Sequence, residues 1–358
     1  MNIPTGPDPN QVRSTSTPPQ TIVIQQTEPK RRVRSWIIRL LFLALGLSVL
    51  LNFSLLATYE EYYSDTASPQ EVFHSGDKDA QNKIAVLKVT GTIMPPFTGR
   101  ILKSIERIRN DDSVKGVVLV IDSPGGLVTD SHQIYHRLKQ LSDKKPMVVA
   151  MKRMAASGGY YVAMGAGPEA KIFAEPTTWT GSIGVIIPRY NLSEFSQKYG
   201  IKSEPLTTGP YKDSLNPFRD LRPDEEKLWK DILDESYGTF IDVIAENRSQ
   251  LDEQGVRDLA TGQIYTSNQA LKNKLVDVIG FEDDALEDLK QQLKKQLNIE
   301  KFRVVTYQYQ LTIFDLFAGY VRAQQPEQTW QTLLDLTVPR AMYFFSWAPA
   351  IPVNSAAE

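Results

Sequence analysis

The sequence predicts an α/β fold with a mainly parallel sheet covered by helices, preceded by one transmembrane helix. Three observations predict it. The mostly apolar stretch of residues 84–89 and the continuous apolar stretches of residues 117–121 and 147–150 are typical of buried strands. A helical pattern over residues 129–141 lies between the second and third of them, as in βαβ units. The apolar run of residues 36–56 is about the 20 residues that cross a bilayer.

The remaining elements continue the α/β pattern. Apolar residues recur at helical spacing over residues 222–248, where Pro223 and the acidic residues after it suit a first turn. Residues 267–271 resemble another helix start, and residues 282–297 predict an amphipathic helix. Because no internal repeat is visible, we expect one globular domain over residues 83–310.

Composition excludes several kinds of site. The 358 residues carry a formal net charge of -2, which argues against a nucleic-acid partner. Cysteine is absent, so thiol nucleophiles, disulfides and cysteine-ligated metals are excluded. The three histidines are His74, His132 and His136; the last two share a helix face but lack an H-E-x-x-H pattern. A solvated or capping role fits them better than metal binding or a catalytic triad.

The N-terminal region predicts a tail, an anchor and a spacer. Residues 1–29 are rich in Pro, Thr, Gln and Ser, which predicts a disordered tail. Basic residues 30–34 precede the run, so we expect a signal anchor over residues 35–57 with the tail cytoplasmic. A cleaved signal peptide fits less well, because the run is long and no small-x-small site follows. Residues 58–82 predict a polar spacer, and the domain would face the outside of a bacterial-type inner membrane, in the periplasm.

Two glycine-containing stretches follow predicted strands. Asp122-Ser-Pro-Gly-Gly126 permits a sharp turn with outward N–H groups, although most such turns are only structural. Met154-Ala-Ala-Ser-Gly-Gly-Tyr-Tyr161 places Ser157 among small residues at a helix start. An exposed nucleophile requires such a position, and so does a plain N-cap serine. The stretch is not a G-x-S-x-G elbow, which argues against an α/β-hydrolase.

A third stretch, residues 207–213, is a turn-rich loop with Lys212 in its middle. A lysine acts as a general base only when it is neutral, and a free lysine has a pKa of about 10.4. Burial away from water can lower that value, but most loop lysines are solvated surface charges. With so few histidines, a serine paired with a lysine is favoured over a serine paired with a histidine.

These stretches, in this order, together with residues 172–185, 260–266 and 270–277, resemble the short form of the signal peptide peptidase A family, serine peptidase family S49. The resemblance spans about residues 83–286 and implies a ClpP/crotonase-like spiral of ββα units. It implies that Ser157 is the nucleophile and Lys212 the base. It also implies that Gly126 and Gly158 form an oxyanion hole and that Ser182 orients the lysine.

The resemblance implies a membrane-anchored endopeptidase that hydrolyses remnant signal peptides, and other unfolded segments, through an acyl-enzyme. No metal or organic cofactor is expected. The implied partners are peptides, the bilayer and further copies of the chain in a homo-oligomer. Apolar patches at residues 313–317 and 342–347 make the C-terminal segment 311–358 a candidate oligomer contact, although a last core helix or a membrane-surface contact fits these patches equally well. Two other functions stay open: a crotonase-type acyl-CoA enzyme, and a catalytically silent membrane scaffold.

Overall fold

The computed structural model describes residues 30–63, 69–309 and 341–344, with side chains described from residue 36 to residue 52 in the first range. The expected tail of residues 1–29 and the patch at 313–317 lie outside the described residues. The chain divides into two units, residues 1–65 and 66–358, each described by itself.

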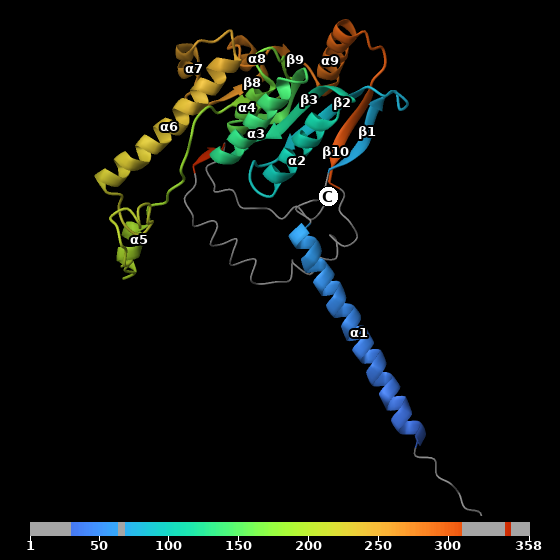
Figure 1. Ribbon diagram of the computed structural model, residues 1–358. Helices are drawn as coiled ribbons and strands as arrows, with labels where there is room; N and C mark the ends of the chain where they lie inside the picture. The colour runs from blue at the N-terminus through green and yellow to red at the C-terminus, as the bar shows by residue number, and fades with distance from the viewer. Residues whose placement is uncertain (1–29, 64–68, 310–340, 345–358) are drawn as a thin grey trace, which may run out of the picture. The chain divides into compact units, whose positions relative to one another are not determined.

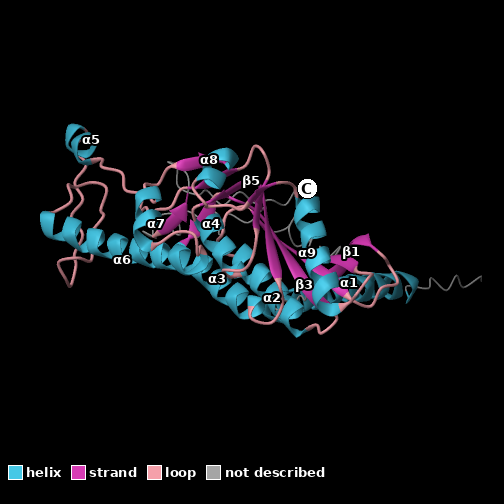
Figure 2. Ribbon diagram, turned by 90° about the horizontal axis from the view of Figure 1, so that it is seen from above, coloured by secondary structure: helices cyan, strands magenta, loops and turns pink. Residues whose placement is uncertain are grey.

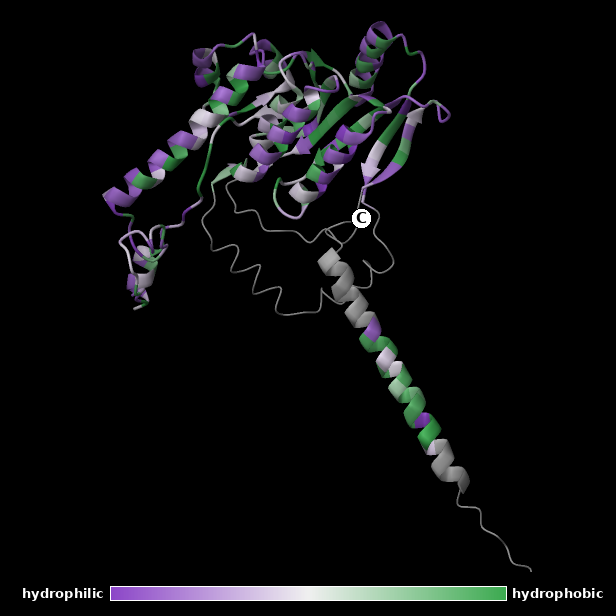
Figure 3. Cartoon of the chain, viewed as in Figure 1, coloured by the Kyte–Doolittle hydropathy of each residue, from purple (hydrophilic) through white to green (hydrophobic). Residues whose placement is uncertain are grey.

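The described part of the first unit, residues 30–63, is a single helix, α1 (Lys30–Tyr63). Its described apolar side chains, from Trp36 to Leu51, are exposed. Figure 3 colours most of this stretch green, for hydrophobic residues. Within the described residues, no helix is both long and apolar enough to cross a membrane.

The second unit is an α/β fold with a mixed sheet in the order β1-β10-β2-β3-β5-β6-β9 (Figures 1 and 2). The central pairs β10–β2, β2–β3, β3–β5, β5–β6 and β6–β9 are parallel, whereas β1–β10 is antiparallel. Strand β7 pairs parallel with the end of β5 and antiparallel with β8. The described strands are β1 (Gln70–Gly76), β2 (Lys83–Thr90), β3 (Val114–Ser123), β4 (Gly125–Leu127), β5 (Met147–Ala156), β6 (Ile172–Ala174), β7 (Trp179–Gly181), β8 (Ile264–Thr266), β9 (Val278–Ile279), β10 (Arg303–Gln308) and β11 (Met342–Phe344).

Helices cover both faces of this sheet. The helices of the second unit are α2 (Phe97–Asn110), α3 (Val128–Ser142), α4 (Gly158–Ala163), α5 (Ser193–Lys198), α6 (Pro223–Asn247), α7 (Glu253–Leu259), α8 (Ser267–Lys272) and α9 (Glu282–Leu297), with a 3-10 turn η2 (Met164–Ala166). Successive side chains of β2 point to opposite faces of the sheet, so the core has two parts. Ile84 and Val86 pack with α9 on one face, and Ala85 and Leu87 pack with α2 and α3 on the other. Burial of both faces explains the continuous apolar strand sequences.

The observed elements agree closely with those expected from periodicity. The predicted strands lie within β2, β3 and β5, and the predicted helix of residues 282–297 matches α9. Several elements were not predicted, among them β1 and α2. Residues 70–76, in the expected spacer, form β1, because pairing with β10 satisfies their backbone groups despite their polar side chains. Helix α2 was overlooked although its apolar residues Ile101, Ile105 and Ile108 are buried at helical spacing.

One segment extends beyond the sheet. We call residues 190–225, which include α5 and the start of α6, the arm (Figures 1 and 2). Helix α6 buries Glu225, and its next buried residue is Phe240. The first half of α6 therefore carries the arm away from the core, and the second half packs on it.

Candidate active site

Ser157 lies at the junction between the end of β5 and the start of α4. Its backbone has φ 54° and ψ -115°, a region that non-glycine residues rarely adopt. The strained turn is held on both sides: the Ser157 N–H donates to the Gly181 carbonyl at 2.7 Å, and the Tyr161 N–H donates to the Ser157 carbonyl at 2.9 Å. Strain that the surrounding structure maintains is concentrated at functional sites.

The Ser157 hydroxyl is buried without a partner. The residue is 1 % exposed, and its Oγ makes no hydrogen bond to any described residue. A buried hydroxyl without a hydrogen bond costs about 1–3 kcal/mol. Because an N-cap serine would use its Oγ to accept a helix N–H, which this one does not, the structure does not support a capping role.

The glycine backbones of β4 and α4 approach each other beside this serine. A Cβ placed on Gly125 would lie 2.7 Å from the Gly158 nitrogen, and one on Gly158 would lie 3.1 Å from the Gly126 nitrogen. Gly125 also has φ 100°, so only glycine fits there without strain. These close approaches bring the backbones of Gly126 and Gly158, the two glycines that the resemblance implies, next to each other.

Ser182 follows β7 as Ser157 follows β5. The two strands pair in register at Ala156 and Gly181, so the serines are the next residues on adjacent strands. Ser182 is buried, has φ 50°, and donates its N–H to the Gln263 carbonyl at 2.7 Å. The structure therefore places Ser182 beside Ser157.

Lys212 lies elsewhere, on the arm. Its side chain is exposed and makes no hydrogen bond or ion pair with the described residues. Since Ser157 Oγ has no partner either, the two side chains are not within hydrogen-bond distance in one copy. The structure therefore brings together four of the five site residues that the resemblance implies, and Lys212 lies apart from them. The four are Gly126, Ser157, Gly158 and Ser182.

Strand β11 adds to the site from the C-terminal segment. It pairs antiparallel with β4, with Tyr343 opposite Gly126, and Met342 exchanges backbone hydrogen bonds with Ile186 at 2.9 and 3.0 Å. The Tyr343 ring is fully buried, stacks on Tyr161 with centroids 5.0 Å apart, and donates its hydroxyl to the Ser236 carbonyl at 2.8 Å. An extended segment thus lies along the strand of Gly126, which sequence patterns did not indicate.

The aromatic groups around Tyr343 form a buried, uncharged cluster. Phe240 lies 4.6 Å from the Tyr343 ring and 5.0 Å from Tyr161, centroid to centroid. Burial raises the pKa of the Tyr161 hydroxyl, which is 2.7 Å from His132 Nδ1. Burial also lowers the pKa of His132. Within the described residues, no group of three or more His, Asp or Glu side chains is placed to hold a metal ion.

Comparisons with known proteins agree with this architecture. Residues 139–297 match peptidase family S49, and residues 80–179 match the Clp protease family. The chain is 40% identical over 205 residues to a protein of Synechocystis sp. named as a protease, covering 57% of this chain and 72% of that protein.

Two further relatives carry peptidase names. A protein of Enterococcus faecium named as a signal peptide peptidase SppA is 34% identical over 255 residues, covering 68% of this chain and 72% of that protein. Protease 4 of Salmonella typhi is 32% identical over 261 residues, covering 70% of this chain and 41% of that protein. The chain belongs to peptidase family S49 and is a serine-type peptidase with a Clp-protease-like domain.

Proposed function

We propose that the chain is an endopeptidase with a Ser157–Lys212 dyad that forms an acyl-enzyme. The observation that carries the proposal is the strained turn at Ser157, next to the Gly158 amide; the buried Ser157 hydroxyl has no hydrogen-bond partner among residues 69–309 and 341–344. Neutral Lys212 would take the hydroxyl proton as Oγ attacks the peptide carbonyl, and would then give it to the leaving amine. Water would hydrolyse the resulting ester.

The N–H groups of Gly126 and Gly158 would stabilise the tetrahedral oxyanion. Their nearness in the structure supports this role, because both belong to backbones packed against each other beside Ser157. Fixed N–H donors lower the barrier because charge develops on the oxygen only in the transition state. Ser182, which lies next to Ser157, would accept or donate a hydrogen bond that orients the lysine amine.

Lys212 would come from a second copy of the chain. A general base must lie within about 2.6–3.2 Å of the proton it removes, and the arm does not bring Lys212 that near in one copy. The arm also exposes apolar side chains that favour contact with protein, among them Tyr190, Phe195, Tyr199 and Leu206. We infer a homo-oligomer in which each arm completes its neighbour's site.

Substrates would bind as extended strands along β4. The pairing of β11 with β4 supports this mode, because a substrate that displaced β11 would meet the same antiparallel backbone partners and the same buried, uncharged aromatic side chains. Apolar peptides suit such surroundings. Remnant signal peptides are apolar, and a relative is named as a signal peptide peptidase, so we propose them as the substrate class.

The helix α1 would anchor the enzyme in the membrane. Support comes from its apolar side chains, exposed on all sides, and from the basic residues 30–34 that precede them. This orientation would leave the N-terminus cytoplasmic and the catalytic unit in the periplasm, at the surface of the inner membrane where signal peptides remain after cleavage.

Labelling with a serine-reactive fluorophosphonate tests the nucleophile. We expect the full-length wild type to be labelled and Ser157→Ala to lose the label, because only an activated hydroxyl reacts at a useful rate. Thr98→Val is the matched control and should keep the label, since Thr98 Oγ1, on α2, is also buried without a hydrogen bond to the described residues. Label retained in Ser157→Ala would reject the nucleophile, and an unlabelled wild type would favour a scaffold or an acyl-CoA enzyme.

A further inference from the structure

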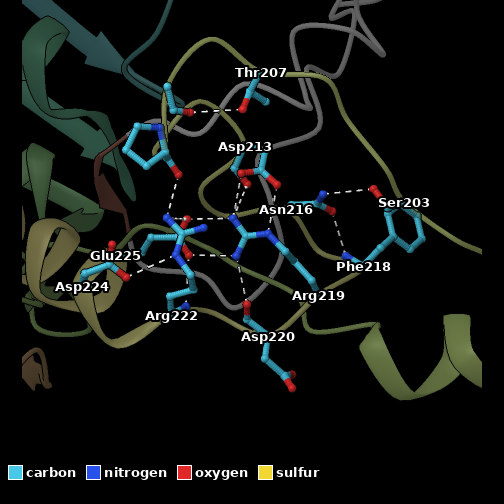
Figure 4. A network of polar contacts seen from close by, with 12 residues as sticks. Ser203, Thr207, Asp213, Asn216, Phe218, Arg219, Asp220, Arg222, Asp224 and Glu225 are labelled. Atoms are coloured by element: carbon cyan, nitrogen blue, oxygen red, sulfur yellow. Dashed lines mark hydrogen bonds and ion pairs between the residues drawn. The ribbon is translucent and has the colours of Figure 1, made fainter.

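Two arginines anchor the loop of Lys212 on both sides of the lysine (Figure 4). Before it, Arg222 Nη2 donates to the Pro210 carbonyl at 2.6 Å. After it, Arg219 binds Asp213 three times: Nε and Nη2 each donate to a carboxylate oxygen at 2.9 Å, and Nη2 donates to the backbone carbonyl at 3.0 Å. The neighbours of Lys212 in the chain are therefore fixed while its own side chain stays unpaired among the described residues.

Glu225, at the start of α6, joins the two arginines. Its side chain is fully buried and accepts from Arg219 Nη1 at 2.8 Å and Nη2 at 2.7 Å. Arg222 approaches the same carboxylate with Nη2 at 2.9 Å and with its backbone N–H at 3.0 Å. The loop is thus bound to a 25-residue helix whose other half packs in the core.

The network stays charged across the pH range of an enzyme assay. The hydrogen bonds from Arg219 lower the pKa of Glu225 to about 2, and they also lower the pKa of Asp213. Both carboxylates are therefore ionised above about pH 4, so the network itself does not titrate where peptidase activity is measured. The charged and titratable groups that meet here are Tyr211, Asp213, Arg219, Asp220, Arg222, Asp224 and Glu225.

We propose that Arg219 is a positioning residue for the reaction, because it fixes the lysine loop and keeps the Asp213 carboxylate from pairing with Lys212. The inference rests on the proposed role of Lys212 as the base. A carboxylate close to an amine stabilises the protonated form, which cannot accept a proton. Asp213 directly follows Lys212 in the chain, but Arg219 engages both of its oxygens. A bidentate arginine suits this task, whereas a lysine would engage the carboxylate as a point charge.

The test is Arg219→Gln in the full-length enzyme, assayed for peptide hydrolysis from pH 5 to pH 10. We expect kcat to fall about ten- to a hundredfold, with KM changed less than about twofold, because in this proposal Arg219 acts through Lys212 and not on the substrate. The acid limb of the kcat profile should move to higher pH by about half a unit to one unit, because the freed Asp213 would stabilise protonated Lys212. In the double variant with Asp213→Asn, the acid limb should return to its wild-type position.

Two further variants keep the test decisive. Arg219→Lys retains the positive charge but cannot bind the Asp213 carboxylate through two N–H groups. Its kcat should lie between those of the wild type and Arg219→Gln. Arg248→Gln is the control for stability, because Arg248 is a buried arginine that binds Asp277 at the far end of α6. An unmoved acid limb in Arg219→Gln, with a kcat loss no larger than that of Arg248→Gln, would show a merely structural role. Full activity in Lys212→Met would instead reject the dyad itself.

Discussion

Lys212→Met is expected to lower kcat by about a thousandfold or more while leaving the fold intact. Methionine keeps the length of the side chain but has no group that accepts the proton of Ser157, and general-base catalysis contributes about 10²–10⁴. Because Lys212 is exposed and unpaired among the described residues, its replacement should change stability by no more than about 0.5 kcal/mol. Turnover of an apolar peptide and thermal unfolding of the full chain give the two measurements.

Lys202→Met is the matched control for this variant. Lys202 is another exposed lysine on the arm, ten positions earlier, and has no role in the proposed chemistry. We expect it to keep wild-type turnover. A kcat for Lys212→Met within tenfold of the wild type would show that another group removes the proton.

Gly126→Ala is expected to lower kcat by about a hundredfold or more with both dyad residues in place. The added Cβ would lie 2.0 Å from the Ile93 carbonyl oxygen and 2.5 Å from its carbon, and backbone atoms do not yield as a flexible side chain does. Strand β4 would therefore shift and carry the Gly126 N–H away from the oxyanion. Loss of one such donor typically costs about 10²–10³ in kcat.

Gly99→Ala provides the comparison. Gly99 lies within α2, and a Cβ there would meet nothing within 4 Å. Alanine should stabilise that helix by about 0.5–1 kcal/mol and leave kcat unchanged. Because the crowding at Gly126 also costs stability, kcat is compared per folded molecule after a thermal melt. Equal kcat values for Gly126→Ala and the wild type would exclude this amide from the oxyanion hole.

The core of the fold was predictable because its signals are local. Strands buried on both faces, such as β3, are continuous apolar runs, and α9 has a clear helical period with acidic residues in its first turn. Strand β1 gave no such signal, because its polar residues are ordered by backbone pairing with β10, more than 220 positions away. The pairing of strand β11 with β4 was also not predictable, since a sequence of three residues is too short to indicate which strand it pairs with.

The candidate site was predictable only in its local part. Ser157 and Gly158 are neighbours in the chain, and the small residues around them indicate the close packing that the structure contains. The position of Lys212 relative to Ser157 was not predictable, because no sequence pattern indicates how far the arm extends from the core of the domain. Arg219 was overlooked for a similar reason: one arginine among many shows no preference in sequence for Asp213 and Glu225.

The central claim is that one copy supplies Ser157 and another supplies Lys212. Co-assembly of two inactive variants in the same oligomer tests this claim directly. Ser157→Ala and Lys212→Met are each expected to be inactive alone, and we co-assemble them by co-expression in one membrane. If sites form between copies, an intact Ser157 meets an intact Lys212 at some interfaces, and hydrolysis should recover to about a quarter of the wild-type rate per chain for random pairing. Co-assembled variants that stay as inactive as either one alone would contradict the account.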